Sequence, residues 1–118
     1  MRRFPSGAVR SDDTGRIRPD YISPYALEEI AMHFTGAKND FGATNYFKGI
    51  KPEDVLASIQ RHSLDLHKSI LENDSEVTRV ELRALAANCI MALHQIVIEE
   101  KGLYTEPYDK IEYVTQPI

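Results

Sequence analysis

The first candidates for chemistry are acidic side chains that gather around one point of the chain. Glu72, Asp74 and Glu76 lie close together, and Glu81 follows them. Magnesium prefers several oxygen ligands and often shares its site with the phosphates of a substrate. Carboxylates on facing sides of a helix hairpin could supply such a site. The alternative is a solvated turn, because acidic residues also stabilise the start of a helix.

For Glu81 this alternative can be made specific. The segment 78–81 reads Thr-Arg-Val-Glu, which has the spacing of a capping box at a helix N-terminus. In that interpretation the Glu81 carboxylate would accept a backbone N–H and would hold no metal. The spacing leaves both interpretations open.

Three polar residues accompany the acidic group. His62 lies on an apolar helical stripe, where a histidine is usually part of the core, while Arg61 points outward to solvent or to a phosphate. His67 is five residues further on, so the two histidines do not share the ligand face of a zinc site of the H-E-x-x-H type. Asn88 follows Glu81 by two helical turns and could bind a base or hydrogen-bond a neighbouring helix.

Three segments of helical periodicity must position these side chains, at 24–35, 52–72 and about 76–101. The first should begin with Ser23 as N-cap and Pro24 at the first helical position, and should end at Gly36. The predicted buried stripe of the second helix comprises Val55, Ile59, Leu66 and Ile70. The predicted buried stripe of the third comprises Leu82, Leu85, Ala86, Cys89, Leu93, Ile96 and Val97.

The remaining segments divide the chain into three parts. Residues 1–22 have no periodic pattern and form a basic arm, 23–103 form the helical domain, and 104–118 form a tail with some alternation that could be a strand or an extended arm. Between the first two helices lies a glycine- and aromatic-rich loop at 36–51, which is long for a plain connector. The predicted fold class is therefore all-α, with three main helices.

Composition narrows the classes of protein. The 118 residues make one domain, and the single cysteine, Cys89, excludes both an internal disulfide and a Cys-x-x-Cys metal site. No apolar run suggests a membrane span and no secretory leader is apparent, so we expect a cytoplasmic protein. The net charge of −4 argues against a general nucleic-acid binder. Residues 1–20 nevertheless hold five arginines against three aspartates.

Several of these segments resemble one known family. Residues 15–24 are similar to an opening segment of the form G-K-x-R-x-D-L-I-P-P, and 36–49 resemble a loop of the form G-A-K-K-Y-G-x-x-N-W-x-x-G. Arg61-His62, the acidic turn and Ala86-Ala87-Asn88 also have counterparts. The chain resembles the dATP/dGTP pyrophosphohydrolases of phages and bacteria, within the wider MazG-like group.

The resemblance implies an all-α enzyme that cleaves a (deoxy)nucleoside triphosphate to the monophosphate and pyrophosphate. The substrates that it implies are dATP and dGTP. It implies Mg²⁺ or Mn²⁺ on helix-borne carboxylates, with a metal-activated water as nucleophile. It also implies a homo-oligomer, a dimer or a tetramer, acting in the cytoplasm of the cell or, for a phage protein, of the host. The small-molecule nucleotide is the expected partner, with neither nucleic acid nor membrane.

On this resemblance we assign roles to individual side chains. The expected metal ligands are Glu72, Asp74 and Glu81, and the expected catalytic residues are His62 and Glu81. The expected substrate-binding residues are Arg16, Arg18, Lys38 and Arg61 for the phosphates, with Asn45, Phe47 and Asn88 for the base or sugar.

The sequence departs from the group's pattern at several of these positions. The MazG-like third helix carries an E-x-x-D motif, whose aspartate is Ala84 here, and the closer family has a histidine at the position of Glu81. The tryptophan of the loop is replaced by Tyr46 or Phe47. The alternatives are therefore a helical protein that binds or sequesters a nucleotide without cleaving it, and a purely structural helical oligomer.

Overall fold

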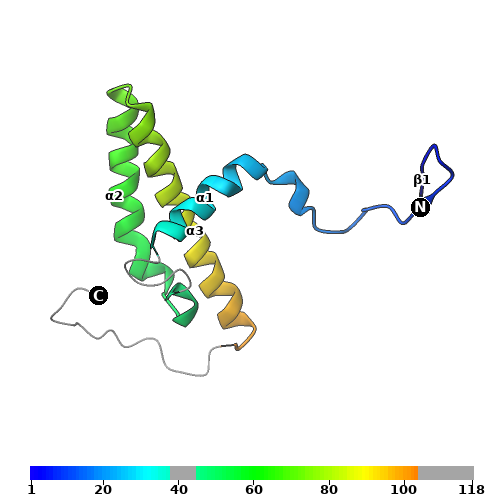
Figure 1. Ribbon diagram of the computed structural model, residues 1–118. Coiled ribbons are helices and arrows are strands. Elements are labelled where there is room, and N and C mark those ends of the chain that lie inside the picture. The colour runs from blue at the N-terminus through cyan, green and yellow to red at the C-terminus, as the bar shows by residue number, and fades with distance from the viewer. Residues whose placement is uncertain (38–44, 104–118) are drawn as a thin grey trace.

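The fold was analysed in a computed structural model, which describes residues 1–37 and 45–103. Three helices dominate it, namely α1 (Pro24–Ala37), α2 (Pro52–Leu71) and α3 (Ser75–Glu100) (Figure 1). Two short 3-10 turns, η1 (Pro19–Tyr21) and η2 (Asn45–Lys48), precede α1 and α2. The predicted all-α class is confirmed. Lys38, most of the loop's motif and the tail 104–118 lie outside the described residues.

Helices α2 and α3 form an antiparallel hairpin whose turn is fixed by its own residues (Figure 1). Asn73 adopts a left-handed conformation with φ of 56°, which an asparagine tolerates better than most residues. The Asp74 carboxylate then accepts a hydrogen bond from the Val77 amide at 3.1 Å and caps α3. Close to the turn, the hydroxyls of Ser69 and Thr78 lie 2.8 Å apart and tie the two helices together.

Helix α1 crosses α3 on the side of the hairpin nearer to the arm (Figure 1). The Ala26 amide donates to the Ser23 hydroxyl at 3.2 Å, so the predicted N-cap is confirmed. The helix does not stop at Gly36 as predicted but continues to Ala37. A glycine can remain helical where no left-handed turn follows it directly, and here it does.

The face of α3 that packs on α2 is the reverse of the predicted one. Ala84, Ala87, Asn88 and Gln95 are buried. The predicted stripe is largely open: Cys89 is exposed, and the exposed fractions of its large apolar members are 52% for Leu82, 62% for Leu93 and 43% each for Ile96 and Val97. Small and amide side chains let the two helices approach closely, whereas the leucine and isoleucine side chains of α3 face outward. We call Leu82, Cys89, Leu93, Ile96 and Val97 the outer stripe.

The hydrophobic core of the described residues is correspondingly small. Its buried apolar members are Val55, Ala84 and Ala87. Ile70, predicted to be in the stripe of α2, is 54% exposed and lies in the last turn of α2, beside the turn that joins α2 to α3. A chain of this size normally buries a larger apolar core, so an isolated subunit leaves much apolar surface in water.

The N-terminal arm extends away from the helices (Figure 1). It contains a short hairpin that the sequence did not predict, in which β1 (Arg2–Arg3) pairs antiparallel with β2 (Val9–Arg10). Gly7 supplies the positive φ of 91° that the turn between them requires. The molecule is therefore elongated, with principal extents of 65 × 46 × 23 Å.

By length and composition, α3 could cross a membrane. An 18-residue window within Ser75–Glu100 has a mean hydropathy of 1.2, and 22% of it is buried in the molecule. The sequence suggested no membrane span because the charged residues at 76–83 interrupt the apolar run of this segment.

Candidate functional site

One contact between side chains that were predicted to be functional joins α2 to α3. His62 Nδ1 lies 2.6 Å from Glu81 Oε2, and the two side chains are 35% and 15% exposed. A carboxylate can only accept, so Nδ1 donates the hydrogen of this contact and Nε2 takes no part in it. The two residues predicted to be catalytic are thus brought together.

The capping-box interpretation of Glu81 is wrong. Helix α3 begins at Ser75, and its N-cap is Asp74. Thr78 lies inside the helix, where its hydroxyl donates to the Asp74 carbonyl at 2.8 Å. Glu81 is therefore beyond the first turn, where backbone amides already have helical partners, and its carboxylate is free to engage His62.

A second ionic group joins α1 to α3. The Glu29 carboxylate bridges two arginines of α3, with Oε1 accepting from Arg79 Nε and Oε2 accepting from an Arg83 amino group. These two hydrogen bonds lower the pKa of Glu29, Arg83 contributing most. The Arg83 side chain is 20% exposed, and its Nε is buried without a hydrogen-bond partner among the described residues. The two arginines therefore retain unused donor capacity.

His33 lies between the two groups. It is one helical turn after Glu29 on α1, and burial is the main cause of the lowered pKa of its imidazole. The positive charges of His62 and Arg83 lower this pKa further. We define the polar junction as the place where three helices bring together Glu29, His33, His62, Arg79, Glu81 and Arg83.

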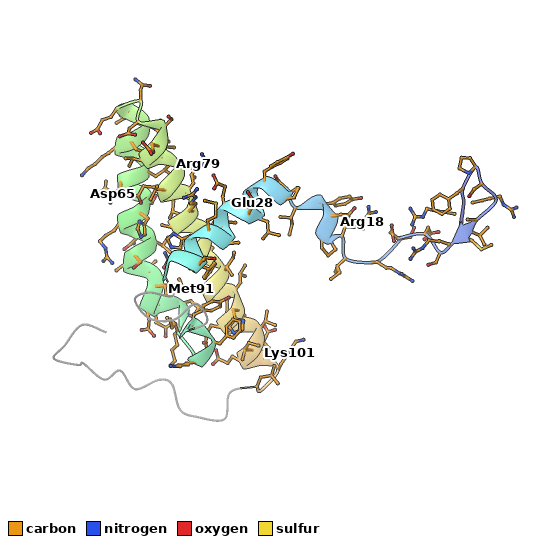
Figure 2. The ribbon with its side chains drawn as sticks, in the orientation of Figure 1. Arg18, Glu28, Asp65, Arg79, Met91 and Lys101 are labelled. Atoms are coloured by element: carbon orange, nitrogen blue, oxygen red, sulfur yellow. The ribbon has the colours of Figure 1, made fainter. Side chains whose placement is uncertain are left out.

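A pocket opens beside the polar junction between α1 and α3. Its volume is about 370 Å³, within the range of small-ligand sites. Glu29, Arg79 and Arg83 form its ionic side, although the surface that the pocket exposes is almost wholly apolar. Its apolar side is formed by Ala26, Ile30, Leu82 and Ala86. Figure 2 shows Arg79 on α3, close to the crossing with α1.

The three predicted metal ligands do not come together in one chain. Asp74 caps α3, Glu72 is the exposed C-cap of α2, and Glu81 is committed to His62. Within residues 1–37 and 45–103, no group of three or more His, Cys, Asp and Glu side chains is arranged to hold a metal ion. The reason is the hairpin itself: Glu81 is almost two turns along α3 from the cap. A complete magnesium site therefore does not fit the described donors of one subunit.

The predicted substrate-binding residues are distributed over several places. Arg61 is exposed and donates to the Ser58 hydroxyl at 3.1 Å. Asn88 is 7% exposed, and its Nδ2 donates to the Ala84 carbonyl of its own helix at 2.8 Å. This contact lies within α3 and is therefore not the hydrogen bond to a neighbouring helix that the sequence offered as the alternative to base binding.

The loop before α2 contributes aromatic rings. Asn45 begins η2, and Phe47 in the same turn stacks on His94 of α3, with ring centroids 4.8 Å apart and an interplanar angle of 17°. Tyr46 meets both rings and also Phe34 of α1. Phe47 is half exposed, so one side of its ring remains open to a base.

A buried amide anchors the end of this loop. Gln95 is 1% exposed, and its Oε1 accepts a hydrogen bond from the Ile50 amide at 3.0 Å. Its Nε2 is buried without a partner among the described residues. The contact spans 45 residues of sequence and holds the loop against α3.

The arginines of the arm are remote from the polar junction within one chain (Figure 2). Arg18 forms a two-pronged contact with Asp20, at 2.9 and 2.7 Å, lies 3.5 Å from Asp13, and its guanidinium stacks 4.5 Å above the Tyr21 ring. Arg16 is exposed. These local contacts neither supply nor exclude a phosphate contact in another subunit, and the predicted phosphate role of both residues stays a prediction.

Comparison with known families decides the relationship. Residues 6–104 match the model of the family described as dATP/dGTP diphosphohydrolase, N-terminal. The chain belongs to this family. Neither a curated protein nor a solved structure gives a significant match. For this member of the dATP/dGTP diphosphohydrolase family, the matched region includes all three helices, the whole polar junction and most of the arm.

Sequence reasoning missed four residues of the polar junction, namely Glu29, His33, Arg79 and Arg83. A signal was available. Glu29 and His33 are four residues apart on one predicted helix, and Arg79 and Arg83 are four apart on another. Such spacing places each pair on one helical face, but pairing the two faces required the crossing of α1 over α3.

Proposed function

We propose that this protein hydrolyses dATP or dGTP to the monophosphate and pyrophosphate, with a divalent cation, Mg²⁺ or Mn²⁺, as cofactor. The family relationship supports the reaction class, and one structural observation supports its location. That observation is the 2.6 Å contact between His62 on α2 and Glu81 on α3. A carboxylate that orients a histidine is a recurrent way to prepare a general base.

In this proposal, side chains of the protein accept the proton that the attacking water releases. Water attacks the α-phosphorus, a new P–O bond forms, and the bond between that phosphorus and the bridging oxygen of the leaving pyrophosphate breaks. His62 Nε2 accepts the proton of the attacking water, while Glu81 holds Nδ1–H and stabilises the imidazolium that forms. Arginines at the polar junction neutralise phosphate charge. The cation would lower the pKa of the water and neutralise the leaving group when bound.

The described residues of one chain do not supply enough ligands for the proposed magnesium site. Of the predicted ligands, Glu81 lies at the polar junction, while Glu72 and Asp74 lie at the turn of the hairpin. The small core and the open outer stripe support a homo-oligomer, a dimer or tetramer, in which a second subunit could add donors. An oligomer would also bury the apolar surface of α3 and so favours an aqueous, cytoplasmic protein over a membrane-bound one.

The second candidate function is nucleotide binding without cleavage. The observation that favours it is the replacement of the expected acidic residue by Ala84, which is 2% exposed and packs against α2. An alanine there can bind no metal. Such a protein would show ligand-induced stabilisation and no turnover.

The deciding experiment is a panel of the eight common ribo- and deoxyribonucleoside triphosphates, with and without Mg²⁺ or Mn²⁺, read by pyrophosphate release. The proposal expects metal-dependent pyrophosphate release, greatest with dATP or dGTP. A purified His62→Ala variant serves as the matched blank for contaminating phosphatases. Absence of turnover with every triphosphate, together with a raised melting temperature in the presence of one, would establish the binding function instead.

A further inference from the structure

The ionic side of the pocket has more positive charge than its own carboxylate can neutralise. Glu29 is one negative charge shared between Arg79 and Arg83, which carry two positive charges. The Arg83 Nε adds a buried N–H without an acceptor among the described residues. The positive charge of Arg83 also contributes to the lowered pKa of His33. This concentration of charge occurs in a chain whose net charge is −4.

A carboxylate that bridges two guanidinium groups occupies the position that a phosphate group would suit better. A phosphate offers more acceptor oxygens and more negative charge than a carboxylate, and planar guanidinium groups bind it with paired hydrogen bonds. The spare donor of Arg83 has no use in the contact with Glu29. The Arg79 side chain is largely exposed, so an anion can reach this arginine from the solvent.

We propose that Arg79 and Arg83 form a phosphate-binding subsite in which Glu29 stands in for the anion until a polyphosphate displaces it. The inference deepens the proposed function, on which its choice of ligand rests, by naming residues for the phosphate chain of the nucleotide. Neither arginine was among the residues assigned to phosphates from the sequence. The apolar side of the pocket, formed in part by Ile30 and Leu82, suits the nucleoside part of such a ligand better than it suits a bare inorganic ion.

This arrangement makes a prediction that an ordinary structural ion pair does not make. Removing the charge of Glu29 should strengthen phosphate binding, because the anion no longer competes with an internal carboxylate. Removing Arg79 should weaken binding. Arg79 is the better arginine to remove first, since its side chain is 65% exposed and its loss leaves no cavity in the core.

The test is calorimetric titration of the full-length protein with inorganic pyrophosphate and with a non-hydrolysable dATP analogue, both in EDTA so that no metal takes part. Glu29→Gln should tighten both ligands by about fivefold or more, and Arg79→Ala should weaken both by about tenfold, the effect of losing one charge-assisted hydrogen bond. Glu28→Gln is the matched control. Glu28 is the neighbouring exposed carboxylate on α1 (Figure 2), it has no ion pair within the described residues, and its replacement should change neither affinity.

In the double variant Glu29→Gln with Arg83→Gln, the carboxylate and the largely buried guanidinium that it pairs with are removed together. No unpaired charge is then left at Arg83. It should lose the gain in affinity produced by Glu29→Gln alone. Unchanged or weaker binding by Glu29→Gln, with a lowered melting temperature, would overturn the subsite and make the cluster a structural ion pair. Tighter binding only of the nucleotide analogue would support the subsite and restrict it to phosphates carried by a nucleotide.

The outcome is separable from that of the proposed reaction. If Glu29→Gln tightens pyrophosphate binding but the wild-type protein releases no pyrophosphate from any triphosphate, the subsite holds and hydrolysis fails. If wild-type turnover is observed and Arg79→Ala alters neither affinity nor KM, hydrolysis holds and the subsite is overturned.

Discussion

A helix in a globular protein usually buries its large apolar side chains and exposes its polar ones, whereas the two faces of α3 show the reverse. The face against α2 carries Glu81, Asn88 and Gln95 among small residues, whereas the outer stripe carries the large apolar side chains. The buried face is specified by individual hydrogen bonds, and the outer stripe by hydrophobicity alone. Hydrogen-bonded polar groups in a helix interface fix its register and hold functional atoms in place. Apolar surface left in water instead favours association.

The difference suggests a division of labour along one helix. The inner face positions the polar junction within one chain, and in the proposed homo-oligomer the outer stripe would be the surface by which subunits associate. Helix α1 covers the part of α3 near Leu82 and Ala86, where the pocket lies, but no described element covers Leu93, Ile96 and Val97. The following predictions test this contrast.

The largest effect is expected on the inner face at Glu81. Glu81→Gln removes the negative charge that stabilises an imidazolium at His62, and the proposed reaction should slow by on the order of a hundredfold, about 2.7 kcal/mol of barrier. The amide retains the size of the side chain, so the fold should remain. Steady-state pyrophosphate release and a thermal melt of the same preparation measure both quantities. Turnover within threefold of wild type would remove Glu81 from the proposed mechanism.

On the outer stripe, Leu93→Asp should disrupt assembly and leave the fold of the subunit intact. Placing a carboxylate in an apolar interface costs several kcal/mol per ion, so the dissociation constant of the oligomer should rise by at least about a hundredfold. Sedimentation velocity over a concentration series gives the constant. Gln60→Asp, on an exposed part of α2, is the control. A wild-type protein that is monomeric at micromolar concentration would contradict the division of labour directly.

A smaller effect is expected at the other end of the inner face. Gln95→Leu has a similar volume but leaves the Ile50 amide without its acceptor, which should lower the free energy of unfolding by about 1–3 kcal/mol. Urea denaturation measures the change. Because the contact holds the loop that carries Phe47, nucleotide affinity should fall as well. Loss of stability without loss of affinity would separate the loop from substrate binding.

The turn of the hairpin allows a sharper test of the predicted metal ligands. Asp74→Ala removes the cap of α3 and should cost about 1 kcal/mol of stability. Asp74→Asn keeps a good capping side chain and removes only the carboxylate charge, so it should leave stability nearly unchanged. A raised magnesium requirement in Asp74→Asn would show that this carboxylate binds metal, in a second subunit or after rearrangement. Unchanged metal dependence would leave Asp74 as a cap alone.

The smallest expected effect concerns His33 and pH. Its pKa is lowered in the folded protein, chiefly by burial, so the unfolded chain binds the proton more readily. Its neutral form therefore contributes stability that is fully present above the unfolded pKa of about 6.5, and this contribution is lost as the pH falls from there through the lower pKa of the folded state. Chemical denaturation between pH 7.5 and 5.5 should show stability decreasing with acidity, with a shallower decrease in His33→Gln. Identical slopes would mean that another group is responsible.

Much of the local structure was determined by sequence alone. Ser23 and Pro24 fix the start of α1 because a hydroxyl cap and a proline suit the first turn of a helix regardless of what lies nearby. Pro52 does the same for α2. The all-α class and the family likewise followed from periodicity and from motifs that are local in the chain.

Which face of α3 turns inward was decided only by the tertiary structure. Periodicity reveals that a helix has an apolar stripe, but not whether that stripe meets α2, α1 or another subunit. The close approach of α2 selected the small residues and amides of α3, and the same approach brought His62 to Glu81 across 19 residues of sequence. Glu29 contacts Arg79 and Arg83 only because α1 crosses α3 at that point. Contacts between helices depend on the crossing geometry of whole elements, and spacing within one element contains no information about that geometry.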